Sequence, residues 1–117
     1  NANLESTIAA IEYLKAFSGN GKRIFVFGDM LELGNSSEEQ HRIIGKKCQK
    51  EGLSAVFTFG NETIVTNEEI NDSIIHKHFG KKEALLSSLN EIISEGDKIL
   101  VKGSRGMRME EIVEKII

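Results

Sequence analysis

Two short loops carry the side chains of this chain that are best suited to chemistry, and each loop follows a strand-like apolar segment. The first loop begins at Gly28 and presents Asp29 just after the apolar segment 23–27. A carboxylate has two acceptor oxygens and can bind the vicinal hydroxyls of a ribose. Because Asp after Gly is also common at the cap of a turn, the spacing leaves both roles open.

The second loop, 103–106, follows the segment 98–102, and the loop together with the last residue of that segment provides two cations and a hydroxyl. The three side chains are those of Lys102, Ser104 and Arg105. Together with the main-chain amides at the start of the next helix, they make a suitable site for a carboxylate or a phosphate. A solvated turn with two scattered cations is the alternative, but the position just after a strand favours the anion site.

The histidines and the single cysteine give weaker signals. His41 lies on the helix after the first loop, and a lone helical His is more often a surface residue than a catalyst. His76 and His78 point to one side of an expected strand, 73–79, but no third ligand is visible, so we expect no metal site. Cys48 falls in the apolar stripe of a helix, which indicates an inert core thiol.

Strand-like and helix-like segments alternate along the chain, which is typical of an α/β domain with a mostly parallel sheet between two layers of helices. The expected strands are 23–27, 55–59, 73–79 and 98–102. The expected helices are 4–17, 36–51, 81–94 and a terminal one with Met109, Ile112, Val113 and Ile116 on its buried face. Right-handed crossovers and the strand order 3-2-1-4 would place the first and last strands side by side. Both loops would then lie at one edge of the sheet.

Local signals refine these helices. Asn3 is a suitable N-cap for the first helix, and Ser36 with Glu39 matches a capping box at the start of the second. Gly45 sits in the middle of that helix, which indicates close packing against another backbone. The polar stretch 61–73 fits either a short helix or an irregular excursion.

Size and charge exclude several classes of protein. A chain of 117 residues forms a single domain, and its formal net charge of −3 argues against a nucleic-acid binder. It has no apolar run of about 18 residues, so we expect no membrane span and no membrane partner. Neither of the glycine-rich phosphate loops, G-x-x-x-x-G-K-[ST] or G-x-G-x-x-G after a strand, is present. The chain starts without Met and contains no Pro, as a domain cut from a longer protein would.

Taken together, the motifs resemble those of the Mur ligases. The matching stretches are Asn1-Ala2-Asn3, G-D-M-x-E-L-G at 28–34, His41 and K-G-S-R-G-M at 102–107. The resemblance covers the whole chain, 1–117, as the C-terminal domain of such an enzyme, with 1–4 as the remnant of a hinge. It implies a three-layer Rossmann-like domain that closes over a central ATPase domain.

The resemblance also implies an activity. Mur ligases build the bacterial cell-wall precursor in the cytoplasm, and the type that this chain resembles most adds D-Ala-D-Ala to UDP-MurNAc-tripeptide. ATP phosphorylates the tripeptide carboxylate, and the amine of the dipeptide attacks the acyl phosphate. ATP and Mg²⁺ are bound mainly by the central domain, so the partners of this chain would be the central and N-terminal domains of its own enzyme. The isolated domain is expected to be inactive, with no catalytic residue of its own.

Site residues follow from the same resemblance. Asn1 and Asn3 match the hinge segment that approaches the adenine, and Asp29 matches the carboxylate expected on the ribose hydroxyls. Lys102, Ser104 and Arg105 match the loop that faces the reacting end and the incoming dipeptide. His41 matches a family position whose role stays open.

A non-enzymatic, flavodoxin-like module of the receiver type is the alternative. Such a domain keeps acids after its first strand and a Lys after its last strand. Here the strand that should end in a phosphorylatable Asp ends in Gly60, and only Asp29 directly follows the first strand. The residues therefore favour the ligase domain.

Overall fold

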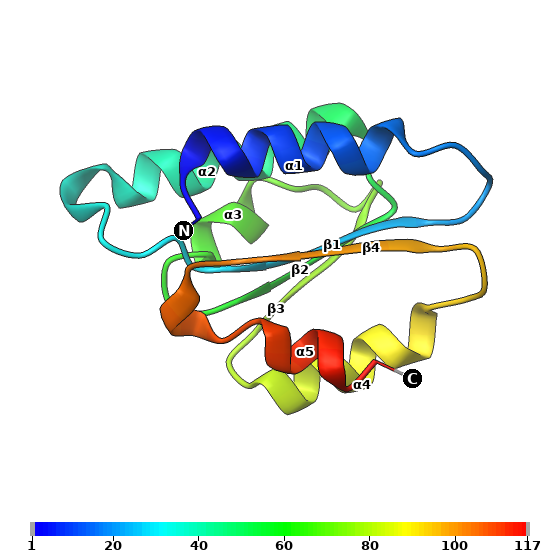
Figure 1. Ribbon diagram of the computed structural model, residues 1–117. Helices are drawn as coiled ribbons and strands as arrows, with labels where there is room; N and C mark the ends of the chain where they lie inside the picture. Colours follow the sequence, from blue (N-terminus) through cyan, green and yellow to red (C-terminus); the bar gives the residue numbers. More distant parts are fainter. Residues whose placement is uncertain (1, 117) are drawn as a thin grey trace.

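The computed structural model describes residues 2–116, and Figure 1 shows a central sheet between two layers of helices. Asn1, one of the predicted hinge residues, lies outside the described residues. The strands are β1 (Arg23–Gly28), β2 (Ala55–Phe59), β3 (Ile75–Phe79) and β4 (Lys98–Lys102). The helices are α1 (Leu4–Ala16), α2 (Ser37–Glu51), α3 (Ile64–Glu68), α4 (Lys82–Ile92) and α5 (Glu110–Glu114), with short 3₁₀ turns η1 (Gly34–Ser36) and η2 (Arg105–Met107).

The sheet has the order β3-β2-β1-β4 with parallel neighbours throughout the described residues, which confirms the predicted order and fold class. Helices α1, α2 and α3 cover one face, and α4 and α5 cover the other (Figure 1). Phe27 at the end of β1 is in register with Lys102 at the end of β4. The two loops that carry the candidate chemistry therefore start from adjacent strand ends.

Strand β1 lies in the middle of the sheet, and all six of its residues are buried. Successive side chains of a strand point to opposite faces, so the strand supplies both hydrophobic cores. Phe25 and Phe27 pack in the core beneath α1 and α2, whereas Ile24 and Val26 pack in the core beneath α4 and α5. The edge strand β4 is only partly buried, although its apolar residues also pack into both cores.

Some local predictions are confirmed and others are wrong. Asn3 is the N-cap of α1, as predicted, and forms a capping box with Ser6. The box predicted at Ser36 and Glu39 does not form, because Ser36 continues from the turn η1 with helical backbone angles and its hydroxyl donates to the carbonyl of Leu33. Val113 is 55% exposed rather than buried, since α5 is only a short helix.

Helices α2 and α3 pack closely, as the glycine in α2 indicated. A Cβ at Gly45 would overlap the carbonyl oxygen of Thr66 on α3. The stretch 61–73 therefore contains a short helix held against α2, and the hydroxyl of Thr66 donates to the carbonyl of His41 at 2.8 Å. Cys48 is buried on the same helix, and burial raises the pKa of its thiol to about 12, as expected for an inert core residue. None of the helices within residues 2–116 has the length and apolar character needed to cross a bilayer.

The amino end of the sheet is fastened by one carboxylate. Asp97, just before β4, accepts the main-chain N–H groups of Lys22 and Ser94, both at 2.8 Å, and pairs with the Lys22 ammonium at 3.1 Å. Burial alone would raise the pKa of Asp97, but these hydrogen bonds and the Lys22 charge lower it below the usual value. The interaction joins the turn before β1 to the turn before β4.

Replacing Asp97 with Asn should therefore destabilise the chain by about 1 kcal/mol at pH 7, because an uncharged amide offers fewer and weaker acceptors. A lowered native pKa means that this stabilisation is complete above the usual Asp pKa of 3.8 and is lost as the pH falls through the native pKa. Urea unfolding of both proteins across this pH range should show the difference between them shrinking in acid. A difference that grows as the pH falls would contradict the assignment.

Candidate functional site

The loops after β1 and β4 are joined by two reciprocal hydrogen bonds. The main-chain N–H of Ser104 donates to the carbonyl of Asp29 at 2.9 Å, and the N–H of Leu31 donates to the Ser104 hydroxyl oxygen at 2.8 Å. Ser104 is only 1% exposed. The sequence-based expectation that both loops share one edge of the sheet is confirmed, and Ser104 is a residue that joins them.

The Asp29 carboxylate also reaches a third loop, the one after β2. It is 4% exposed and accepts the main-chain N–H groups of Asn61, Glu62 and Thr63, each at 3.0 Å. Gly60 makes this possible, because its φ of +119° suits glycine and a Cβ there would overlap the carboxylate. Of the two roles left open for Asp29, the structure shows the turn cap. Its contact with a ribose stays a prediction.

His41 is fully buried, so the expectation of a surface residue is wrong. Its Nε2 accepts the N–H of Met30 at 3.0 Å, and its Nδ1 lies 2.8 Å from the carbonyl oxygen of Ser37. A carbonyl only accepts and an amide N–H only donates, so these contacts fit a neutral ring with its proton on Nδ1. The ring also packs 5.8 Å from that of Phe27. His41 thus fixes the loop after β1 from the side of α2.

Sequence reasoning missed the partners that complete this arrangement. The Ser37 hydroxyl donates to the carboxylate of Glu62, which ties the start of α2 to the loop after β2. Ser37 and His41 are four residues apart and so lie on one face of a helix, which is the only signal in the sequence. No local sequence pattern identifies Glu62 or Thr63 as part of this site, because their hydrogen-bond partners, Ser37 and Asp29, are more than twenty residues away in the chain.

An open hollow of about 570 Å³ lies beside these loops, within the range of about 300–1,000 Å³ typical of small-molecule sites. Its lining mixes apolar side chains with a few polar groups. The residues that line it are Asp29, Leu31, Phe59, Gly60, Asn61, Ile64, His78, Gly80 and Met107. The combination suits a ligand with an apolar part and a few hydrogen-bonding groups.

His78 contributes an uncharged ring to that hollow. Burial lowers its pKa, an effect that the Asp29 charge and the Gly60 carbonyl only partly oppose. Its Nδ1 lies 2.8 Å from the hydroxyl of Thr58, whereas His76 contacts Asn67 and Asp72 instead. In the part of the chain that the structure describes, no group of three or more His, Cys, Asp or Glu side chains could hold a metal ion.

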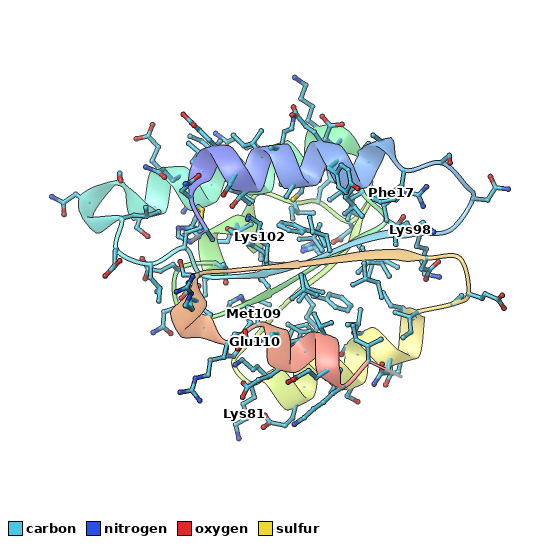
Figure 2. All side chains as sticks on the ribbon, viewed as in Figure 1. Phe17, Lys81, Lys98, Lys102, Met109 and Glu110 are labelled. Carbon is cyan, nitrogen blue, oxygen red and sulfur yellow. The ribbon has the colours of Figure 1, made fainter. Side chains whose placement is uncertain are left out.

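The predicted cations lie at the same edge of the sheet. Lys102 is half-buried at the end of β4, and Figure 2 shows it at the opposite end of that strand from Lys98, beneath α1. Arg105 is exposed and begins η2, directly after Ser104. Asn3 is exposed at the start of α1, where its side-chain oxygen accepts the N–H of Ser6 at 2.9 Å. The side-chain nitrogen of Asn3 takes no part in that cap.

The family model described as Mur ligase, glutamate ligase domain, matches residues 1–105. The UDP-N-acetylmuramoyl-tripeptide–D-alanyl-D-alanine ligase of Bacillus subtilis is 38% identical over 123 aligned positions, which cover 100% of this chain and 26% of that protein.

Two solved structures are also similar. The MurF ligase of Thermotoga maritima in complex with ADP superposes with a TM-score of 0.84 at 30% identity, covering 99% of this chain and 26% of that one. MurF from Acinetobacter baumannii gives a TM-score of 0.87 at 28% identity, covering 99% and 25%. The chain spans about a quarter of the length of the proteins that it matches.

Replacing Asp29 with Ala should destabilise the chain by about 2–4 kcal/mol, because three main-chain N–H groups would lose a charged acceptor. The exposed Asp72, changed to Ala, is a matched control and should alter the free energy of unfolding by less than about 0.5 kcal/mol. Urea unfolding monitored by circular dichroism measures both values. Equal stability of the two variants would show that the cap contributes little.

Proposed function

This chain belongs to the Mur ligase family, and from that premise we propose that it is the C-terminal domain of a MurF-type ligase. The complete enzyme would join D-Ala-D-Ala to UDP-MurNAc-tripeptide at the expense of ATP. Residues 1–117 would form one domain, with 1–4 continuing a hinge from a central ATPase domain. The similarity to such ligases over the whole chain supports this proposal, as does the coverage of only a quarter of their length.

The observation that carries the proposal is the junction of the two motif loops at one edge of the sheet. Asp29 and Leu31 of the first loop are hydrogen-bonded to Ser104 of the second. The loops that carry the acidic group and the two cations are thereby joined at the carboxyl ends of parallel strands, where α/β domains bind ligands.

The reaction needs two steps at one carbonyl carbon. The carboxylate of the tripeptide takes the γ-phosphoryl group of ATP, which releases ADP. The amine of D-Ala-D-Ala then attacks the acyl carbon, a C–N bond forms, phosphate leaves and the amine gives up a proton. Such chemistry depends on positioned charges and on exclusion of water, which would otherwise hydrolyse the acyl phosphate.

The residues of this chain would contribute binding and orientation. Asp29 would bind the ribose hydroxyls through Oδ2, which accepts one N–H and keeps a further lone pair. Asn3, with its neighbour Asn1, would approach the adenine from the hinge. Lys102 and Arg105 would face the reacting end and the carboxylate of the incoming dipeptide.

Two of the predicted site residues would act through the loops. Ser104 is almost fully buried and already accepts an N–H, so we assign it chiefly to holding Arg105 in place, with its own hydroxyl proton left for a ligand. His41 would hold the loop that carries Asp29, through its contact with Met30.

The remaining parts of the machinery would lie elsewhere in the complete enzyme. This chain has no triphosphate-binding loop, so ATP and Mg²⁺ would be bound mainly by the central domain. Closure of this domain over the central one would exclude water and bring its cations to the reaction. We place the enzyme in the bacterial cytoplasm, where its nucleotide-linked substrate and ATP are available.

The receiver-like alternative gains no support from the structure. Strand β2 ends at Phe59 and is followed by Gly60, so no carboxylate stands where a receiver domain is phosphorylated. Asp29 is bound by three main-chain amides instead of lying in a group of acids.

The direct test uses the complete protein of which this chain is a part. Incubation with ATP, Mg²⁺, UDP-MurNAc-tripeptide and D-Ala-D-Ala should release ADP and phosphate and yield the pentapeptide product, which mass spectrometry identifies. Omission of any substrate should abolish that product, and the isolated 117-residue chain should make none. A complete protein that consumes ATP only with a different amine would refute the assignment of the dipeptide.

In the complete enzyme, Arg105→Ala and Lys102→Met should each lower kcat/KM for the dipeptide by about 10- to 100-fold, because a charge-assisted hydrogen bond contributes about 1.5–3 kcal/mol. Lys98→Met is the matched control, since Lys98 lies at the other end of β4 (Figure 2). Steady-state kinetics measures all three variants. Loss of activity in Lys98→Met equal to that in Lys102→Met would show that the position of the charge does not matter.

A further inference from the structure

The turn that carries Arg105 is held at both of its ends. At the front end, Ser104 is hydrogen-bonded to the loop after β1. Within η2, the N–H of Met107 donates to the Ser104 carbonyl, and the N–H of Arg108 donates to the Arg105 carbonyl. At the back end, Arg108 has a φ of +51°, a left-handed conformation that is unusual for a residue with a side chain. Such a conformation persists only where neighbouring contacts stabilise it.

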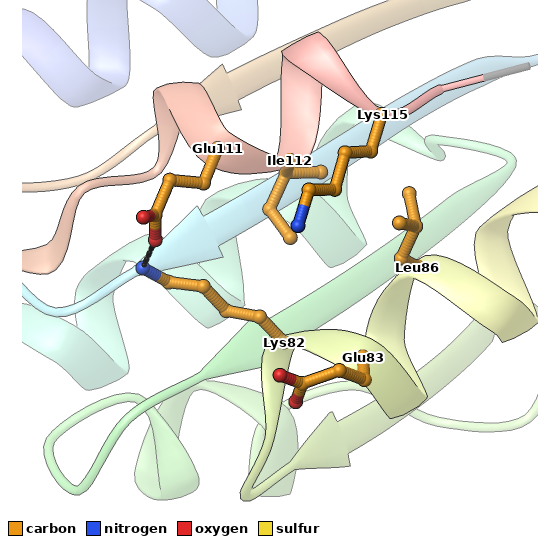
Figure 3. A pocket seen from close by; sticks show the side chains of 6 residues that line it. All are labelled: Lys82, Glu83, Leu86, Glu111, Ile112 and Lys115. Atoms are coloured by element: carbon orange, nitrogen blue, oxygen red, sulfur yellow. Dashed lines mark hydrogen bonds and ion pairs between the residues drawn. The ribbon is translucent and has the colours of Figure 1, made fainter.

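Lys82, the first residue of α4, supplies a contact at that back end. Its ammonium lies 3.2 Å from the carbonyl oxygen of Arg108 and 2.6 Å from the carboxylate of Glu111. Figure 3 shows the side chain reaching from α4 to Glu111 on α5. The hydrogen bond from Lys82 lowers the pKa of Glu111, so this carboxylate is ionised at neutral pH.

The same ammonium lies 5.6 Å from the centre of the Phe59 ring, within the range of a cation–π contact. Phe59 is the last residue of β2 and lines the hollow beside Asp29. Lys82 therefore touches the end of β2, the turn after η2 and the start of α5 at once. Among the lysines of residues 2–116, Lys82 is the one that contacts the Arg108 carbonyl, the Glu111 carboxylate and the Phe59 ring together.

We propose that Lys82 is a positioning residue for the loop 103–108, and that it sets where Arg105 stands by holding the carbonyl of Arg108. The dipeptide part of this inference rests on the proposed function, because it takes Arg105 to face the incoming dipeptide. Ser104 fixes one end of the turn and Lys82 fixes the other, so the exposed cation between them has a defined direction. Lys82 itself need not touch a substrate.

A simpler role would be that Lys82 and Glu111 only pin α4 to α5. In that case the removal of either partner would have the same effects. If Lys82 acts through the Arg108 carbonyl, Glu111→Gln should be much milder than Lys82→Met, because the ammonium stays next to the carbonyl. The two roles therefore differ in a measurable way.

The experiment compares four variants of the complete enzyme: Lys82→Met, Lys82→Arg, Glu111→Gln and, as a matched control, Lys81→Met. Lys81 is the neighbouring residue and is exposed, and Figure 2 shows it at the outer side of the molecule. The first readout is the KM for D-Ala-D-Ala and for ATP. The second is the rate of trypsin cleavage after Arg105 and Arg108, measured by mass spectrometry, which reports opening of the turn without any activity.

We expect Lys82→Met to raise the KM for the dipeptide about tenfold and cleavage in the turn by a similar factor, while the KM for ATP changes less than about twofold. Lys82→Arg should recover most of both effects, because a guanidinium can also donate to the Arg108 carbonyl. Glu111→Gln and Lys81→Met should stay within about threefold of the unchanged enzyme. Melting temperatures should differ little, since partly exposed ion pairs contribute little to stability.

Two results would overturn the inference. Equal cleavage of the turn in Lys82→Met and Lys81→Met would show that Lys82 does not hold it. Equal effects of Lys82→Met and Glu111→Gln on every readout would reduce the contact to a link between helices. If the unchanged enzyme instead makes no pentapeptide, the proposed function fails, but the cleavage rates still decide whether Lys82 holds the turn.

Discussion

Asp29 is the junction on which the carboxyl edge of this sheet depends. Its main-chain carbonyl accepts the N–H of Ser104 from the loop after β4, and its carboxylate accepts three N–H groups from the loop after β2. A parallel sheet brings these three loops to the same edge but leaves their conformations undefined. Asp29, the residue just after β1, is hydrogen-bonded to both of the other loops. Each of these hydrogen bonds joins residues more than thirty positions apart in the sequence, so they fix the loops relative to one another. Without Asp29, three buried or partly buried amides would lose a charged partner.

The other buried polar groups at this edge extend the same arrangement. His41 connects α2 to the loop after β1, and Ser37 connects α2 to Glu62 in the loop after β2. The frame is thus built of hydrogen bonds between loops, with apolar layers on both sides. Binding groups carried by such a frame keep their geometry before a ligand arrives, so less conformational entropy is lost on binding. Of the two cations, Arg105 stands at the surface of this frame, whereas Lys102 is half-buried at the end of β4.

The sequence predicted the architecture well because the signals for it are local. The apolar run of β1 indicated a parallel strand covered on both faces, and the predicted order 3-2-1-4 is the order observed. The partners of polar side chains were not predictable in the same way. His41 was expected at the surface because helical spacing reports only the neighbours on its own helix, whereas its acceptor role depends on Met30 in another loop. The box expected at Ser36 failed for a related reason, since the preceding turn had already taken its hydroxyl.

A carboxylate that caps a turn can still bind a ligand, and Asp29 illustrates the physical reason. Two of its three amide donors share Oδ1, whereas Oδ2 accepts only the N–H of Asn61. A carboxylate oxygen offers two lone pairs, so Oδ2 retains one acceptor position, and Asp29 is one of the residues that line the hollow. The amides that hold the group also keep it oriented, so a hydroxyl donor would meet an acceptor that needs no rearrangement. The structural role of Asp29 and its proposed binding role therefore support each other: the contacts that bury the carboxylate are the ones that prepare its remaining lone pair.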